Sequence, residues 1–180
     1  MIHAYPMNIS SPQRIPCSNR RLVLAALCAL PLAACGGGDS EEEGVEKALD
    51  AFARDLNARP IVPAELPARI RAYLSSNPSF FGSTVTLLDA SLKATTSPYV
   101  FKKGVGYADS NLIDDKTYGI DSQPWLVPAR DSKTSTWTEP YFDAGGGDIW
   151  MKTRTVPLLR DGVVYALVTT DLPTKDPSSK

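Results

Sequence analysis

The sequence predicts an α+β domain in which two helices precede an antiparallel sheet. Apolar residues recur at helical spacing in two segments, 44–57 and 64–75. From residue 83 onward the spacing changes to that of strands. An Asp-Gly turn at residues 160–162 joins segments 149–158 and 163–170, which is typical of a hairpin. Helices followed by a meander of strands indicate the α+β class.

The two helices are predicted from an apolar face and from residues that start and stop a helix. In the first helix, Val45, Leu49, Phe52 and Leu56 recur on one side. The acidic residues 41–43 just before it suit the positive end of the helix dipole. The second helix repeats this spacing at Leu66, Ile70, Tyr73 and Leu74. Prolines separate the two helices, and Asn77-Pro78 ends the second.

The remaining elements are predicted as short strands and turns. Residues 83–88, 99–101 and 137–142 are strand-like, and residues 104–106 form a turn. A short helix is expected at residues 125–130, after an irregular stretch that begins at Tyr118. Residues 143–148 are expected to form a hairpin turn. Their three glycines are not a phosphate-binding loop, because no helix follows them.

The N-terminal 35 residues have the layout of a lipoprotein signal. A basic region precedes an apolar run at residues 22–32, which is shorter than the roughly 20 residues a membrane span requires. The run ends in Leu32-Ala33-Ala34-Cys35, which resembles the bacterial lipobox, so Cys35 is expected to carry the lipid. Gly36 after the cysteine resembles an outer-membrane sorting signal. The expected location is therefore the periplasmic side of the cell envelope.

These observations predict four segments along the chain. Residues 1–34 are a lipoprotein signal peptide, and residues 35–43 are the anchor cysteine with a flexible acidic tether. Residues 44–172 form one domain, and residues 173–180 form a disordered tail. No second apolar run follows the leader, so we expect no membrane span and no output module after this domain.

Composition excludes several classes of function once the leader is removed. The only histidine, His3, lies in the leader, as do Cys17 and Cys28. Catalytic triads, Cys/His zinc sites and a disulfide are therefore excluded, and no metal or cofactor is expected. The remaining 16 basic and 20 acidic residues give a net charge of −4, which disfavours nucleic-acid binding.

Three stretches resemble the extracellular Cache (PDC-type) sensor domains of bacterial chemoreceptors and histidine kinases. They are Gln123-Pro124-Trp125, the segment Trp-Thr-Glu-Pro-Tyr-Phe-Asp at 137–143, and residues 162–172. The resemblance extends over about residues 45–172. It implies a single Cache domain with a PAS-like antiparallel sheet and a long N-terminal helix. It also implies a ligand pocket between the sheet and the loops that cover it.

The same resemblance implies a set of ligand-binding residues. In members that bind amino acids, an Arg two residues before a Trp holds the ligand carboxylate, while two Asp and a Tyr hold the ammonium. The matching positions here are Tyr118, Gln123, Trp125, Tyr141, Asp143 and Asp171. Gln123 replaces the Arg, and Leu126 replaces an aromatic residue. Because Gln lacks the charge for a bidentate pair, we expect a small amine, or an amino acid held mainly by its ammonium.

Each of these residues also has a purely structural interpretation. Trp125 and Tyr141 could be core aromatics, Asp143 could simply begin a turn, and Asp171 could cap a strand. Asp114-Asp115 lacks the spacing of a calcium loop and is expected to be solvated.

Three functions remain open at this point. The first is a sensor-type binding protein that acts through a receptor or kinase partner, or as a homodimer. The second is an interaction module of the envelope that has lost its ligand, which the Gln123 and Leu126 departures favour. The third is an enzyme using paired carboxylates. We expect no enzyme, because nothing supplies a nucleophile or a clear acid–base pair.

Overall fold

The structure is a computed structural model that describes residues 40–179. The predicted signal peptide, the lipobox and Cys35 lie outside the described residues. Three α-helices, two 3₁₀ helices and eight strands follow one another along the chain: α1 (Glu41–Asn57), η1 (Pro63–Glu65), α2 (Leu66–Ser76), β1 (Gly82–Leu88), β2 (Ala94–Thr96), β3 (Pro98–Lys103), β4 (Gly106–Asn111), η2 (Ile120–Ser122), α3 (Val127–Ser132), β5 (Thr136–Trp137), β6 (Tyr141–Phe142), β7 (Trp150–Arg160) and β8 (Val163–Pro173).

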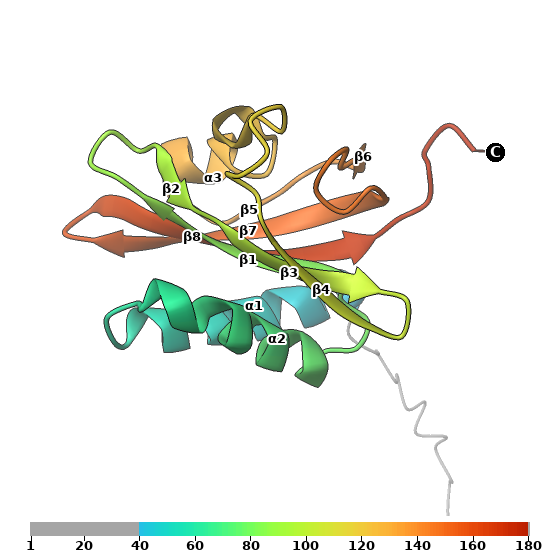
Figure 1. The fold of residues 1–180 in the computed structure, drawn as a ribbon, viewed down its shortest axis with the longest axis horizontal. Coiled ribbons are helices and arrows are strands. Elements are labelled where there is room, and N and C mark those ends of the chain that lie inside the picture. The colour runs from blue at the N-terminus through green and yellow to red at the C-terminus, as the bar shows by residue number, and fades with distance from the viewer. Residues whose placement is uncertain (1–39, 180) are drawn as a thin grey trace, which may run out of the picture. The chain divides into compact units, whose positions relative to one another are not determined.

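The strands form one antiparallel sheet in the order β4-β3-β1-β8-β7-β5. Strand β2 pairs with β1, and β6 pairs with β7, at the ends of these longer strands. The β7–β8 hairpin is the longest pairing, and β8 lies at the centre between β7 and β1. Helices α1 and α2 cover one face of the sheet, and α3 with the neighbouring loops covers the other (Figure 1).

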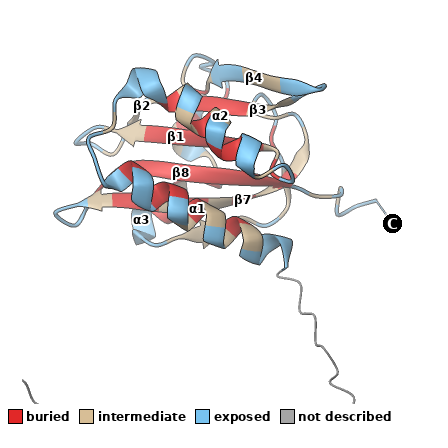
Figure 2. Ribbon diagram, turned by 90° about the horizontal axis from the view of Figure 1, so that it is seen from below, coloured by how far each residue is buried: buried red, intermediate tan, exposed pale blue. Residues whose placement is uncertain are grey.

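The helix layer is held by the apolar faces that the sequence predicts. Ser40 caps α1 by accepting the Glu43 amide at 3.2 Å, so the helix begins at Glu41. Phe52 of α1 stacks on Tyr73 of α2 with ring centroids 4.5 Å apart. Helix α1 packs on β7 and β8, α2 packs on β1 and β3, and the shared core includes Val85, Val100 and Val168. Figure 2 shows the outer sides of both helices exposed above buried strands.

The opposite face of the sheet is built differently, because hydroxyl side chains form much of its buried surface. The fully or almost fully buried residues there include Thr84, Thr86, Ser97, Thr153, Thr155 and Thr169. They satisfy one another: the Ser97 hydroxyl lies 2.9 Å from that of Thr84 and 2.7 Å from that of Thr86. Above this polar surface, Tyr118, Trp125 and Leu126 pack on Tyr99 and Leu167 in a second core.

Most predicted elements are confirmed, with three corrections. The prediction of a tether at residues 41–43 is wrong, because these residues form the first turn of α1. The single strand predicted at 137–142 is wrong: β5 and β6 are separate two-residue strands, and Pro140 between them lacks the amide hydrogen a continuous ladder needs. Strands β2 and β4 were not predicted.

The turns and the C-terminal end agree with the sequence in most respects. The β7–β8 turn has positive φ at Asp161 (53°) and Gly162 (75°), as an Asp-Gly hairpin turn requires. Strand β8 extends to Pro173, and the Thr174 amide still bonds to the Trp150 carbonyl at 2.9 Å. Disorder of residues 173–180 remains a prediction. Among residues 40–179, no helix has both the length and the apolar character that a membrane crossing needs.

Candidate functional site

Asp171 is a carboxylate in the middle of the sheet, on the face away from α1 and α2. It lies in β8, opposite Gly82 of β1 and Thr153 of β7. Its side chain is only 4% exposed. The hydroxyl of Tyr99 donates to Oδ2 at 2.9 Å, and that of Thr153 donates to Oδ1 at 2.8 Å. Neither donor carries a charge, so the carboxylate is hydrogen-bonded but not neutralised.

Asp143 brings a second carboxylate to the same region from the turn between β6 and β7. It is 5% exposed. The Tyr118 hydroxyl donates to Oδ1 at 3.0 Å, and the Gly147 amide donates to Oδ2 at 3.0 Å. The Asp143 backbone also closes the turn by bonding to Ile149 and Asp148. Asp143 therefore does begin a turn, as its structural interpretation holds, but its side chain points inward.

Aromatic side chains connect the two carboxylates to the covering loops. Trp125 Nε1 donates to the Tyr118 hydroxyl at 3.1 Å, and Tyr118 in turn donates to Asp143. Tyr141 shares a hydrogen bond of 2.9 Å with Thr153, the residue that donates to Asp171. Five of the six predicted site residues thus lie in two neighbouring hydrogen-bonded chains, one around Asp143 and one around Asp171. We call the two chains together the carboxylate cluster: Tyr118, Trp125, Tyr141, Asp143 and Asp171, with Tyr99 and Thr153.

The Gln123 side chain bonds to the backbone and not to a side chain of the cluster. Its side-chain amide donates to the backbone carbonyl of Tyr118, so it ties the loop together rather than reaching either carboxylate. The structure therefore gives Gln123 a role in loop geometry. Leu126, at the other departure from the family pattern, is completely buried in the second core.

Burial controls the electrostatics of the cluster. Burial raises the pKa of Asp171 to about 7, and the negative charge of Asp143 adds to this effect. Burial likewise raises the pKa of Asp143, against the hydrogen bonds from Tyr118 and Gly147. The pKa values of Tyr99, Tyr118 and Tyr141 are raised by burial too, so these hydroxyls stay protonated and act as donors. No ion pair reaches either carboxylate within residues 40–179.

Three glycines allow the cluster to close this tightly, and a Cβ on one of them, Gly146, would overlap the Asp143 carboxylate. A Cβ on Gly82 would lie 2.4 Å from the Tyr99 hydroxyl and 2.8 Å from Asp171 Oδ2. A Cβ on Gly147 would lie 2.7 Å from both Met151 and Phe81. The backbone of β1 and of the 143–148 turn therefore approaches the cluster from two sides, where a side chain would collide.

We expect Gly82→Ala to destabilise the domain by about 1–3 kcal/mol, because overpacking must displace Tyr99 or Asp171. Urea unfolding measures the change. The matched control is Gly44→Ala: Gly44 lies inside α1 with no atom within 4 Å of an added Cβ, so alanine is expected to stabilise by about 0.5–1 kcal/mol. Equal stability of Gly82→Ala and the unaltered chain would contradict this close approach.

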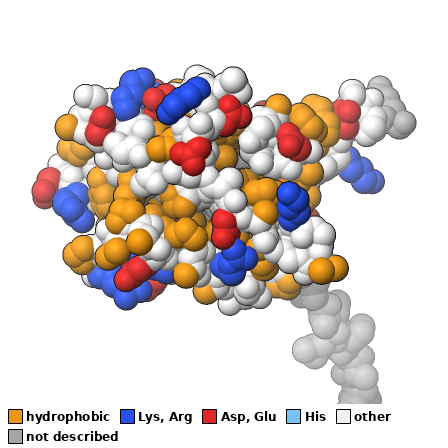
Figure 3. Space-filling model, viewed as in Figure 1, with side chains coloured by type: hydrophobic (Ala, Val, Ile, Leu, Met, Phe, Trp, Pro, Cys, Tyr) orange, Lys and Arg blue, Asp and Glu red, His pale blue; other side chains and the backbone are white. Residues whose placement is uncertain are grey.

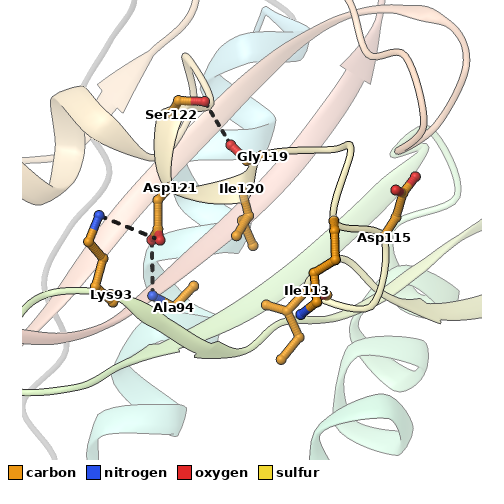
Figure 4. A pocket seen from close by; sticks show the side chains of 9 residues that line it. Lys93, Ala94, Ile113, Asp115, Gly119, Ile120, Asp121 and Ser122 are labelled. Atoms are coloured by element: carbon orange, nitrogen blue, oxygen red, sulfur yellow. Dashed lines mark hydrogen bonds and ion pairs between the residues drawn. The ribbon is translucent and has the colours of Figure 1, made fainter.

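An open cavity of about 420 Å³ lies beside the loop that carries Tyr118, but neither Asp143 nor Asp171 lines it. Its walls are Lys93, just before β2, and Ala94, together with Ile113, Asp115, Lys116 and residues 119–122 (Figure 4). Within the described residues, no group of three or more His, Cys, Asp or Glu side chains is arranged to hold a metal ion. On the face seen in Figure 3, acidic and basic side chains are interspersed.

Sequence reasoning missed Tyr99 and Thr153, the two donors to Asp171. Both lie in strands and look like ordinary β-formers, so their type alone gives no functional signal. Their position would have followed from the strand register, since Thr153 lies directly opposite Asp171. That register depends on pairing between strands, which one sequence does not reveal.

Comparison with known proteins gives a family and a fold. The family described as "methyl-accepting chemotaxis protein-like, first PDC sensor domain" matches residues 66–176. Among solved structures, the extracellular domain of soHK1S-Z6, assigned as a histidine kinase, is 23% identical with a TM-score of 0.65, and the match covers 74% of this chain and 53% of that chain. A structure called methyl-accepting chemotaxis protein X is 19% identical with a TM-score of 0.55, covering 72% and 56%.

A third solved structure is the ligand-binding domain of the Campylobacter jejuni chemoreceptor Tlp3 in complex with L-valine. It is 16% identical with a TM-score of 0.54, and the match covers 71% of this chain and 50% of that chain. This chain spans about half the length of these three solved chains. At such identities the likeness is one of fold. No curated protein sequence matches the chain.

Proposed function

The chain belongs to the family of methyl-accepting chemotaxis protein-like PDC sensor domains, and from this premise we propose that it binds a small amine or an amino-acid-like solute. The observation that carries the proposal is the carboxylate cluster. Asp143 and Asp171 are buried together, are surrounded by aromatic side chains, and receive hydrogen bonds only from uncharged donors in the described structure. A ligand ammonium would supply the missing positive charge.

Magnitudes support an ammonium as the ligand group. Hydrogen bonds to a charged group stabilise by about 1.5–3 kcal/mol each, and a cation over an aromatic face adds about 0.5–2 kcal/mol. A few such contacts, less the cost of association, give dissociation constants of order micromolar. The ligands named for Tlp3 structures, L-valine and isoleucine, also carry an ammonium.

Gln123 is the reason to favour amines over ordinary amino acids. A carboxylate ligand group is best held by the planar, charged fork of Arg, which Gln cannot reproduce. The Gln123 amide is also engaged with the Tyr118 carbonyl. We therefore propose that the ligand is recognised mainly through its ammonium, with little contribution from a carboxylate.

A lipid anchor would fix the location of the domain. We propose that Cys35 is lipidated and holds the domain on the periplasmic side of the envelope, with the outer membrane favoured by Gly36. The family consists of sensor domains, so the binding event is proposed to act through a receptor or kinase partner, or through a homodimer, without catalysis.

A second candidate is a ligand-free interaction module of the envelope. The closed state of the cluster favours it, because Tyr99, Thr153, Tyr118 and the Gly147 amide already occupy the carboxylate oxygens. Under this alternative, the buried carboxylates would be structural features.

A thermal-shift screen of the full chain at pH 8 separates the two candidates. We expect simple amines, polyamines or quaternary ammonium compounds to raise the melting temperature by several degrees at saturation, because a ligand at 100 times its Kd stabilises by about 2.7 kcal/mol. The neutral alcohol of the same shape is the control. If no cationic compound shifts the melting temperature, the sensor proposal fails and the interaction module takes its place.

A further inference from the structure

The open cavity beside the loop that carries Tyr118 has the size of a small-molecule site. Its volume of about 420 Å³ falls within the roughly 300–1,000 Å³ of ligand pockets. Figure 4 shows Lys93, Ala94 and Asp121 together at one end and Ile113 and Asp115 at the other, with Ile120 between them. Two lysines, two aspartates and three aliphatic residues contribute to its lining, together with Gly119 and Ser122.

The two aspartates of this cavity are already used to fix its walls. Asp121 Oδ1 accepts the Ala94 amide at 3.0 Å and so joins η2 to β2. Asp115 accepts the amide of Thr117 at 2.8 Å and its hydroxyl at 2.6 Å, and these bonds lower the pKa of Asp115. Each carboxylate thus holds the backbone of a wall through its Oδ1 atom.

The two lysines are less fully engaged. The Lys93 ammonium lies 3.7 Å from Asp121 Oδ2, which is an ion pair but longer than a hydrogen bond. Lys116 donates to the Ile113 carbonyl at 3.2 Å. Each ammonium has three donors, so both can still bond to an anion that enters the cavity. The lining is balanced in charge, with two lysines and two aspartates, and the two ammonium groups are its charged donors for a ligand.

The rest of the lining is aliphatic and preformed. Ala94, Ile113 and Ile120 present apolar surface. Ile120 is 8% exposed and belongs to the second core, with Leu112 and Tyr118 of the same loop. A ligand would therefore meet walls that the core already holds in place, so binding needs little ordering of the loop.

We propose that this cavity is a second ligand site, specific for a carboxylate carried on a short aliphatic chain. The carboxylate lies between Lys93 and Lys116, and the aliphatic chain packs against Ile113 and Ile120. The site differs in charge preference from the carboxylate cluster, whose buried Asp143 and Asp171 repel an anion. The inference does not depend on amine binding at the cluster.

Titration of the ¹⁵N-labelled full chain with butyrate and isobutyrate, followed by NMR, tests the proposal. We expect saturable shifts centred on the amides of Ala94, Ile113, Gly119 and Ser122. Lys93→Gln and Lys116→Gln are each expected to weaken binding about fivefold, since both side chains are exposed, and together about 25-fold. Lys103→Gln, an exposed lysine at the end of β3, is the control and should leave the affinity unchanged.

Four results would overturn the proposal. The first is the absence of saturable binding of either acid. The second is equal affinity of the double lysine variant and the unaltered chain. The third is equally tight binding of isobutanol, which would make the site merely apolar. The fourth is loss of carboxylate binding in Asp171→Asn, with shifts centred on Asp143, which would place the ligand in the carboxylate cluster.

Discussion

Asp171→Asn is expected to make the domain more stable at pH 8 and to abolish amine binding. The folded chain at this pH must keep a charged carboxylate 4% exposed, and no cation from residues 40–179 pairs with it. One pKa unit corresponds to about 1.4 kcal/mol, so a rise from 3.8 to about 7 represents a cost of order 4 kcal/mol. Asparagine has the same shape without the charge: its oxygen accepts from one of the two hydroxyls, and its amide nitrogen donates to the other, which turns to accept.

The pH dependence of this stabilisation provides a control within the same experiment. Because the folded pKa of Asp171 is raised, the folded state retains a proton that the unfolded state has lost between about pH 4 and pH 7. The free energy of unfolding of the unaltered chain should therefore fall as pH rises through this window and level off above pH 7. The advantage of Asp171→Asn should shrink toward pH 4. A variant that is destabilised by several kcal/mol at pH 8 would show that the carboxylate serves the fold.

The helices and the β7–β8 hairpin could be predicted because their signals are local. Helical spacing of Val45, Leu49, Phe52 and Leu56 appears in the sequence and in the buried face of α1. Asp161-Gly162 specifies its turn through positive φ at both residues. Strand β4 was missed for the opposite reason: its residues GYADSN are largely polar, and the strand exists because it pairs with β3 along its whole length.

The candidate site could be predicted in part. Family motifs led to Asp143 and Asp171, which the fold brings into one cluster with Tyr118, Trp125 and Tyr141. Composition and spacing alone would not have done so, since Asp143 and Asp171 are 28 positions apart and come from a turn and a strand. The closure of the cluster by Tyr99 and Thr153 depends on strand register and on Gly82, so it became visible only in three dimensions.

Because hydrogen bonds within the protein already occupy both carboxylates, a ligand has to compete with them. An ammonium that reaches Asp171 has to share or replace the hydrogen bonds from Tyr99 and Thr153, and the 143–148 turn must admit it, since the Gly147 amide bonds directly to Asp143. The apparent affinity is then reduced by the fraction of molecules in the open state. A ligand-induced movement of this turn would connect the cluster to β6 and β7, which flank it.

Amine affinity is expected to rise about tenfold per pH unit between pH 5 and pH 7, and to level off above pH 7. The charged ligand needs an ionised Asp171, and below its pKa of about 7 the carboxyl group must first lose a proton. Asp143, whose pKa is also raised by burial, titrates with it as a pair, so the profile belongs to both groups.

Isothermal titration at pH 5, 6, 7 and 8 with an amine that stays protonated throughout measures the slope. Repeating it in buffers of different ionisation enthalpy should show proton release on binding at pH 6 and none at pH 8. An affinity that stays constant across this range would mean that the ammonium does not bind to the buried carboxylates. Asp131→Asn, which removes an exposed aspartate that pairs with Arg130 outside the cluster, should leave the profile unchanged.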